Sequence, residues 1–88
     1  MEEIEKELNI VFAEHKQKYI GVFDNSEGLV AKQNNAINFT PIFESLTDKL
    51  ISKSNEFLEK NKNYSKPEIE NFIKDKIKEF SHFLISPF

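Results

Sequence analysis

The chain has no cysteine, and at 88 residues this absence limits how it can become stable. A chain of this length buries only about 60% of its unfolded surface, so its core is marginal unless something supports it. Without cysteine there is no disulfide framework and no thiolate metal site. The remaining supports are tight helix packing or association with another chain. Nine phenylalanines provide large apolar groups for either purpose.

The charge pattern disfavours several classes of partner. The net charge is −3 and all twelve cations are lysines, so the arginine-containing basic face typical of nucleic-acid-binding proteins is missing. The first five residues carry three acids, the opposite of the basic start of a signal peptide. No apolar run approaches the ~20 residues that a membrane span needs. These features predict a cytoplasmic protein without a membrane span.

Apolar residues recur at helical spacing in three parts of the chain. The predicted helices span residues 2–17, 41–60 and 66–85. Thr40 is a good N-cap and Pro41 suits the first helical position, which places the start of the second helix there. Ser65 and Glu68 form a capping box ahead of the third helix, whose apolar stripe is the most regular of the three.

Residues 19–32 differ from their surroundings and predict a β-hairpin. Tyr19, Ile20, Val22 and Phe23 are β-branched or aromatic, as is typical of a strand. The segment 24–28 is rich in turn-forming residues and ends in glycine, and the residues after it can return as the second strand. The expected fold is therefore a single α+β domain over residues 1–88, mostly helical, in the order helix, β-hairpin, helix, helix.

Few residues suggest catalysis or cofactor binding. Asp24-x-Ser26-x-Gly28 partly matches a calcium loop, but Leu29 stands at the sixth position and Asn35 at the twelfth. The two glycines, seven residues apart, cannot form a phosphate-binding loop. The two histidines, His15 and His82, lack a nucleophile or ligand partner at a suitable spacing. The sequence thus predicts no catalytic residue, no metal site and no cofactor.

The aromatic and acidic residues instead suggest contact with a protein partner. The last helix is apolar over more than one core-facing stripe, and the first helix begins with acids that suit a basic target. The residues predicted to meet a partner are Phe80, Phe83, Ile85 and Phe88 near the C-terminus, Glu2 and Glu3 in the first helix, and Tyr19 and Phe23 in the hairpin.

Residues 1–60 resemble the start of a roadblock-type domain, the fold of the roadblock dynein light chains. Such domains begin with an amphipathic helix, and Ile20-Gly21-Val22-Phe23, the turn 24–28 and the helix from Thr40 follow in the same order. The remaining 28 residues predict a helix, where that family has three more strands and a closing helix. The resemblance implies a pared-down relative that associates through a helix or a sheet edge, without a nucleotide site.

The function predicted from these features is a non-enzymatic protein-binding module, a scaffold or adaptor subunit that forms a homodimer or joins a larger complex. An alternative of a different class is a small inhibitor or immunity-type protein that blocks an enzyme by covering its surface. A third reading, a helical DNA-binding protein, would place Lys74, Lys76 and Lys78 in the major groove.

Overall fold

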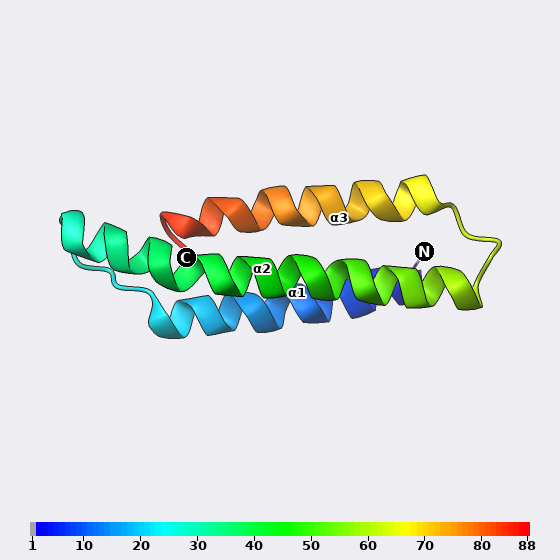
Figure 1. Cartoon of the computed structure of the whole chain (residues 1–88), viewed down its shortest axis with the longest axis horizontal. Coiled ribbons are helices and arrows are strands. Elements are labelled where there is room, and N and C mark those ends of the chain that lie inside the picture. The colour runs from blue at the N-terminus through cyan, green and yellow to red at the C-terminus, as the bar shows by residue number, and fades with distance from the viewer. Residues whose placement is uncertain (1) are drawn as a thin grey trace.

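The computed structural model describes residues 2–88, apart from the side chain of Glu2, and within this range the chain forms an antiparallel bundle of three α-helices. The helices are α1 (Glu2–Val22), α2 (Leu29–Lys60) and α3 (Lys66–Ser81), and one 3-10 turn, η1 (His82–Leu84), follows α3. Figure 1 shows α1 and α3 lying along α2, which spans the full length of the molecule. The bundle measures 50 × 18 × 17 Å.

The core runs along the inside of the bundle and changes character along its length. The buried apolar residues of this core are Ile4, Leu8, Val11, Phe12 and Tyr19 of α1, Phe39, Leu46 and Leu50 of α2, and Ile69, Ile73 and Phe80 of α3. Where α1 and α3 begin, the core is mainly aliphatic. Toward their C-termini it is aromatic, and the Phe80 ring lies 5.6 Å from Phe12 and 5.5 Å from Phe39.

The predicted β-hairpin is wrong, and with it the α+β fold class, because residues 2–88 contain no strand. Tyr19 lies four residues after the buried His15, so it continues the inner stripe of α1 and lengthens that helix to Val22. Its ring packs 5.1 Å from that of Phe39, and its hydroxyl donates to the carbonyl of Leu84 at 2.7 Å. These tertiary contacts outweigh β propensity, which is a weak preference, and an isolated hairpin is marginal in water.

The predicted start of the second helix at residue 41 is also displaced. The helix begins at Leu29, so Pro41 lies inside α2, where its missing N–H removes one backbone hydrogen bond. Thr40 does not cap a helix; its hydroxyl donates to the carbonyl of Ala36 at 3.0 Å. Ala31, Asn35 and Phe39 are all buried at four-residue spacing, which explains why the helix extends to this region.

The start of the third helix is confirmed, and its end differs by a few residues. Ser65 caps α3 by accepting a hydrogen bond from the Glu68 N–H at 3.5 Å, with Pro67 in the first turn. The α-helical geometry ends at Ser81, so Ile85 lies beyond both α3 and η1. Within residues 2–88, every helix is too short or too polar to cross a lipid bilayer.

The helices differ in length, and this leaves one end of the bundle incomplete. With 32 residues, α2 is longer than α1 with 21 and α3 with 16. In Figure 1 the first turns of α2 extend on the left beyond the ends of both other helices. We call residues 29–38 the overhang and this end the open end. The opposite end, where residues 61–65 join α2 to α3, is the closed end.

Candidate protein-binding surface at the open end

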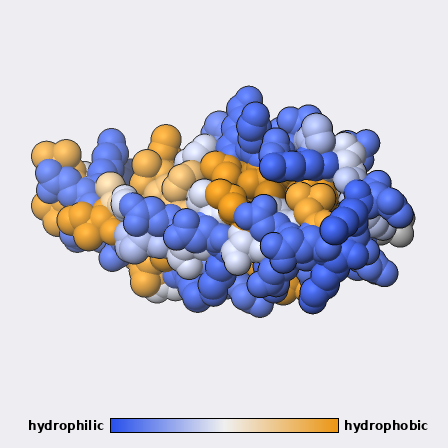
Figure 2. Space-filling model, turned by 45° about the vertical axis from the view of Figure 1, so that its right-hand side comes forward, coloured by the Kyte–Doolittle hydropathy of each residue, from blue (hydrophilic) through white to orange (hydrophobic). Residues whose placement is uncertain are grey.

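The overhang carries large apolar side chains that face solvent. Leu29, Val30 and Ile37 are 70%, 72% and 69% exposed, and nearby Ile85 is 86% exposed. Leu29, Gln33 and Ile37 follow one another at four-residue spacing, and Val30 lies seven residues before Ile37, so the four share one side of the helix. In Figure 2 apolar side chains are visible at the narrow left end and in a second band across the middle, while the right-hand end is mostly hydrophilic.

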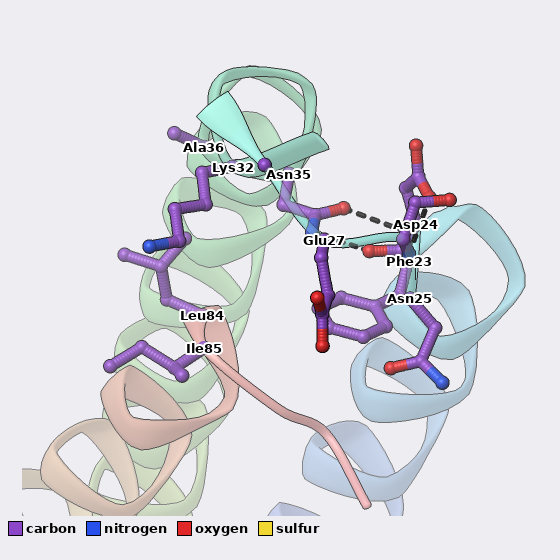
Figure 3. A pocket seen from close by; sticks show the side chains of 11 residues that line it. Phe23, Asp24, Asn25, Glu27, Lys32, Asn35, Ala36, Leu84 and Ile85 are labelled. Atoms are coloured by element: carbon purple, nitrogen blue, oxygen red, sulfur yellow. Dashed lines mark hydrogen bonds between the residues drawn. The ribbon is translucent and has the colours of Figure 1, made fainter. Parts of the chain in front are cut away.

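A hollow of about 700 Å³ lies beside the overhang. Figure 3 shows Lys32, Ala36, Leu84 and Ile85 on one side of it and the connection after α1 on the other. The floor and walls combine apolar groups with the acids Asp24 and Glu27 of that connection. The hollow marks the place where α3 has ended and α2 continues alone.

The connection between α1 and α2 is fastened by one buried side chain. The carboxamide oxygen of Asn35 accepts from the Asp24 N–H at 2.7 Å, and its NH₂ group donates to the Asp24 carbonyl at 2.9 Å (Figure 3). The Ser26 N–H donates to the Asp24 carboxylate at 2.9 Å and holds the pKa of that carboxyl below its ordinary value. These bonds hold the connection on the side of α2 where Asn35 lies. The side that carries Leu29, Val30 and Ile37 stays exposed.

The structure separates the predicted contact residues into two groups. Phe80 and Tyr19 are fully buried and belong to the core, and Phe83 is half-buried beneath the Lys16 ammonium, 4.8 Å from its ring. Phe23, Ile85 and Phe88 lie at the open end, where the rings of Phe23 and Phe88 are 6.0 Å apart. Phe88 is 80% exposed although Pro87 before it is buried.

The acids predicted to face a partner lie far from this group. Glu3 is exposed near the start of α1, at the closed end, and the Glu2 side chain is outside the described part of the structure. Farther along α1, Glu7 and Glu14 line a groove together with Lys49 and Lys53 of α2. Glu56 of α2 lines the groove as well, so acids and lysines alternate there and this part of α1 does not present a purely acidic face.

Sequence reasoning misses three residues of the overhang: the predicted hairpin places Leu29 and Val30 in a strand, and Ile37 falls outside every predicted helix. One signal was available. Residues 33–43 form the longest stretch without an acid or a lysine, and residues 80–88 form the next longest. The two stretches meet at the hollow, through Ala36 on one side and Ile85 on the other. Depletion of charge is a compositional mark of the centre of protein interfaces.

One of the two histidines is buried in the core and the other is exposed. His15 is fully buried, with Nδ1 donating to the Val11 carbonyl at 2.7 Å and Nε2 lying 3.1 Å from the Ser45 hydroxyl oxygen. His82 is exposed at the start of η1. Among the described side chains, histidine, aspartate and glutamate do not form a group of three that could hold a metal ion. His15 therefore acts as a core residue that joins α1 to α2.

Comparison of the chain with protein-family models, with curated proteins and with solved structures gave no match. The resemblance to roadblock-type domains therefore stays a prediction. The strands that such a resemblance implies are not found in the described part of the chain.

Proposed function

We propose that this protein is a non-enzymatic protein-binding module, a scaffold or adaptor subunit that engages a protein partner through the open end of its bundle. One observation carries the proposal: Leu29, Val30 and Ile37 are each about 70% exposed on a helix that extends beyond the rest of the fold. The largest apolar patch on a monomeric protein is typically about 300–600 Å² and often marks an interaction site.

The outer face of the overhang makes little contact with the bundle, whereas Ala31 and Asn35 on its inner face are buried. Its outer side chains contact solvent, and among the described residues no side chain caps the start of α2. An exposed helix start without a cap or an acid in its first turn is weakly stable on its own. A surface that stabilises the fold so little is better explained by a contact with another protein. The predicted cytoplasmic location is compatible with such a subunit.

The proposal is tested by capture experiments with matched variants. The tagged wild-type protein is compared with Ile37→Asp, which places a charge on the overhang, and with Ile10→Asp, which changes an isoleucine 58% exposed on α1. Both sites are exposed, so both variants should retain helicity by circular dichroism. We expect a specific protein to be captured by the wild type and by Ile10→Asp, and lost with Ile37→Asp. Equal capture by all three would contradict the proposal.

The same experiment addresses the alternative of an inhibitor. An inhibitor would capture one dominant enzyme and reduce its activity at a one-to-one ratio. An inhibitor that used the acids of α1 would be insensitive to Ile37→Asp but would weaken when Glu3 and Glu7 are replaced by glutamine. A scaffold subunit would leave the activity of its partner unchanged.

A further inference from the structure

We propose that the partner of the overhang is a second copy of this chain, and that two bundles join through their open ends as an antiparallel helix pair. This inference rests on the proposed function, because it identifies the occupant of the same surface. It follows from the charge, the symmetry and the size of the overhang.

Charge favours a second copy. Each chain has a net charge of −3, so most pairs of surfaces on two copies repel one another. Residues 29–43 contain no acid and one cation, Lys32, although 31% of the whole chain is charged. The first turns of two α2 helices can therefore meet without acids on the paired helices, while Asp24 and Glu27 lie in the connection beside them. A foreign partner steered by charge would find almost none to recognise on this surface.

The pattern of side chains is self-complementary. In a two-fold pair, a residue i of one copy that contacts residue j of the other is matched by the reverse contact. An antiparallel overlap centred near Gln33 places Val30 of each copy beside Ile37 of the other, with the two Gln33 side chains close to the axis. Leu29 and Ala36 then continue the stripe toward the hollow, where Ile85 is exposed.

The chain also limits how far the two helices can overlap. Glu44 is exposed and lies seven residues after Ile37, on the same side of α2. A longer overlap would bring Glu44 against Val30 of the other copy and bury a carboxylate in an apolar contact. The overlap is therefore confined to the overhang, about 15 Å of helix at 1.5 Å per residue.

The size of the surface predicts a weak but specific dimer. The exposed apolar side chains of the overhang together with Ile85 present several hundred Å², against roughly 800 Å² per partner in a standard interface. We expect the dimer to have a dissociation constant on the order of micromolar. The dimer would be about 85 Å long, because two bundles of 50 Å share about 15 Å of helix.

Sedimentation velocity across the micromolar range and small-angle X-ray scattering test the arrangement. We expect a concentration-dependent dimer with a maximum dimension near 85 Å, at least tenfold weaker with Ile37→Asp and unchanged with Ile10→Asp. Ile37→Ala, which removes apolar area without adding charge, should weaken the dimer less. Because the chain has no cysteine, Gln33→Cys introduces a single thiol, and a short thiol-specific linker should join two copies there but not through Lys53→Cys.

The outcomes separate the two proposals. A monomer at all concentrations whose capture of another protein is lost with Ile37→Asp would overturn the self-association and leave the binding module standing. A dimer insensitive to Ile37→Asp, or one only about 50 Å long, would overturn the open-end arrangement. A monomer that captures nothing would overturn both.

Discussion

The two ends of this bundle are built from different kinds of residues. At the closed end, the Asn61 N–H and side-chain NH₂ both donate to the Phe57 carbonyl, and Ser65 caps α3. The Tyr64 ring packs 4.8 Å from that of Phe57. Lys60 stands in the last turn of α2 and Glu68 in the first turn of α3, each at the helix end whose dipole favours its charge. This end is complete within one chain.

At the open end, the start of α2 has neither a side-chain cap nor an acid in its first turn. α2 begins after Gly28, whose φ of 113° lies in the region that glycine adopts without strain. The first residues of the helix are Leu29 and Val30, both exposed, where the closed end has polar groups. The comparison shows that capping side chains and favourable charges at the helix ends can complete one end of the bundle within a single chain. Where they are missing, as at the start of α2, the fold leaves apolar side chains exposed.

The largest effect is expected from the aromatic core that supports the open half. Phe80 is fully buried, with its ring 5.3 Å from Phe83 and 6.2 Å from Phe43. Phe80→Ala should lower the free energy of unfolding by about 3–5 kcal/mol, because it removes these contacts and leaves a cavity. Urea denaturation measures the loss, and Phe80→Leu should lose less. A cost below about 1 kcal/mol would show that the aromatic cluster does not hold this half together.

A smaller effect is expected from the side chain that fastens the open-end connection. Asn35→Ala removes both hydrogen bonds to the Asp24 backbone and should cost about 2 kcal/mol. The matched change at the closed end, Asn61→Ala, removes one side-chain hydrogen bond and should cost about 1 kcal/mol. Hydrogen exchange of the Asp24 amide should accelerate in the first variant only. Equal costs would remove this distinction between the ends.

Tyr19, near the open end, should make the stability of the fold depend on pH in the alkaline range. Burial raises the pKa of its hydroxyl above the ordinary value, so the folded state keeps the proton after the unfolded chain has lost it. This stabilisation is fully present below the unfolded pKa of about 10 and is lost as the pH rises through the folded pKa. We expect the free energy of unfolding to fall in this alkaline range. Tyr19→Phe should remove that part of the slope, at a cost of about 1 kcal/mol for the bond to Leu84.

The control for the pH experiment is Tyr64 at the closed end, which is 37% exposed. Tyr64→Phe should leave the alkaline slope of wild type in place. If both tyrosine variants change the slope equally, the effect does not come from the buried hydroxyl at the open end.

The smallest expected effect is a gain in stability. Leu29→Glu places an acid at the first position of α2, where the helix dipole favours a negative charge by about 0.3–1 kcal/mol. The same change removes an exposed apolar side chain, so stability should rise slightly while dimerisation weakens. Thermal denaturation and sedimentation measure the two effects on one sample. A loss of stability would show that Leu29 supports the fold itself.

The candidate surface could be predicted from the sequence only in part. Ile85, Phe88 and Phe23 were predicted as contact residues, and the structure places them at the open end. Phe80 and Tyr19 could not be told apart from them, because an aromatic residue on a helix faces either the core or solvent according to where its neighbours lie. The overhang was missed because its exposure depends on the unequal lengths of the three helices.

The sequence by itself determined the parts of the fold whose signals act over one or two helical turns. The capping of α3 by Ser65 and the inner stripes of Ile4, Leu8 and Leu50 follow from local hydrogen bonding and from helical periodicity. Only the tertiary structure decided residues 19–40. There β-branched residues, four asparagines and the proline that follows at position 41 favour turns or strands locally. Tyr19 and Asn35, however, make their contacts with residues 65 and 11 positions away. Such contacts form only in the folded bundle, so no local pattern could show that they outweigh the local preference.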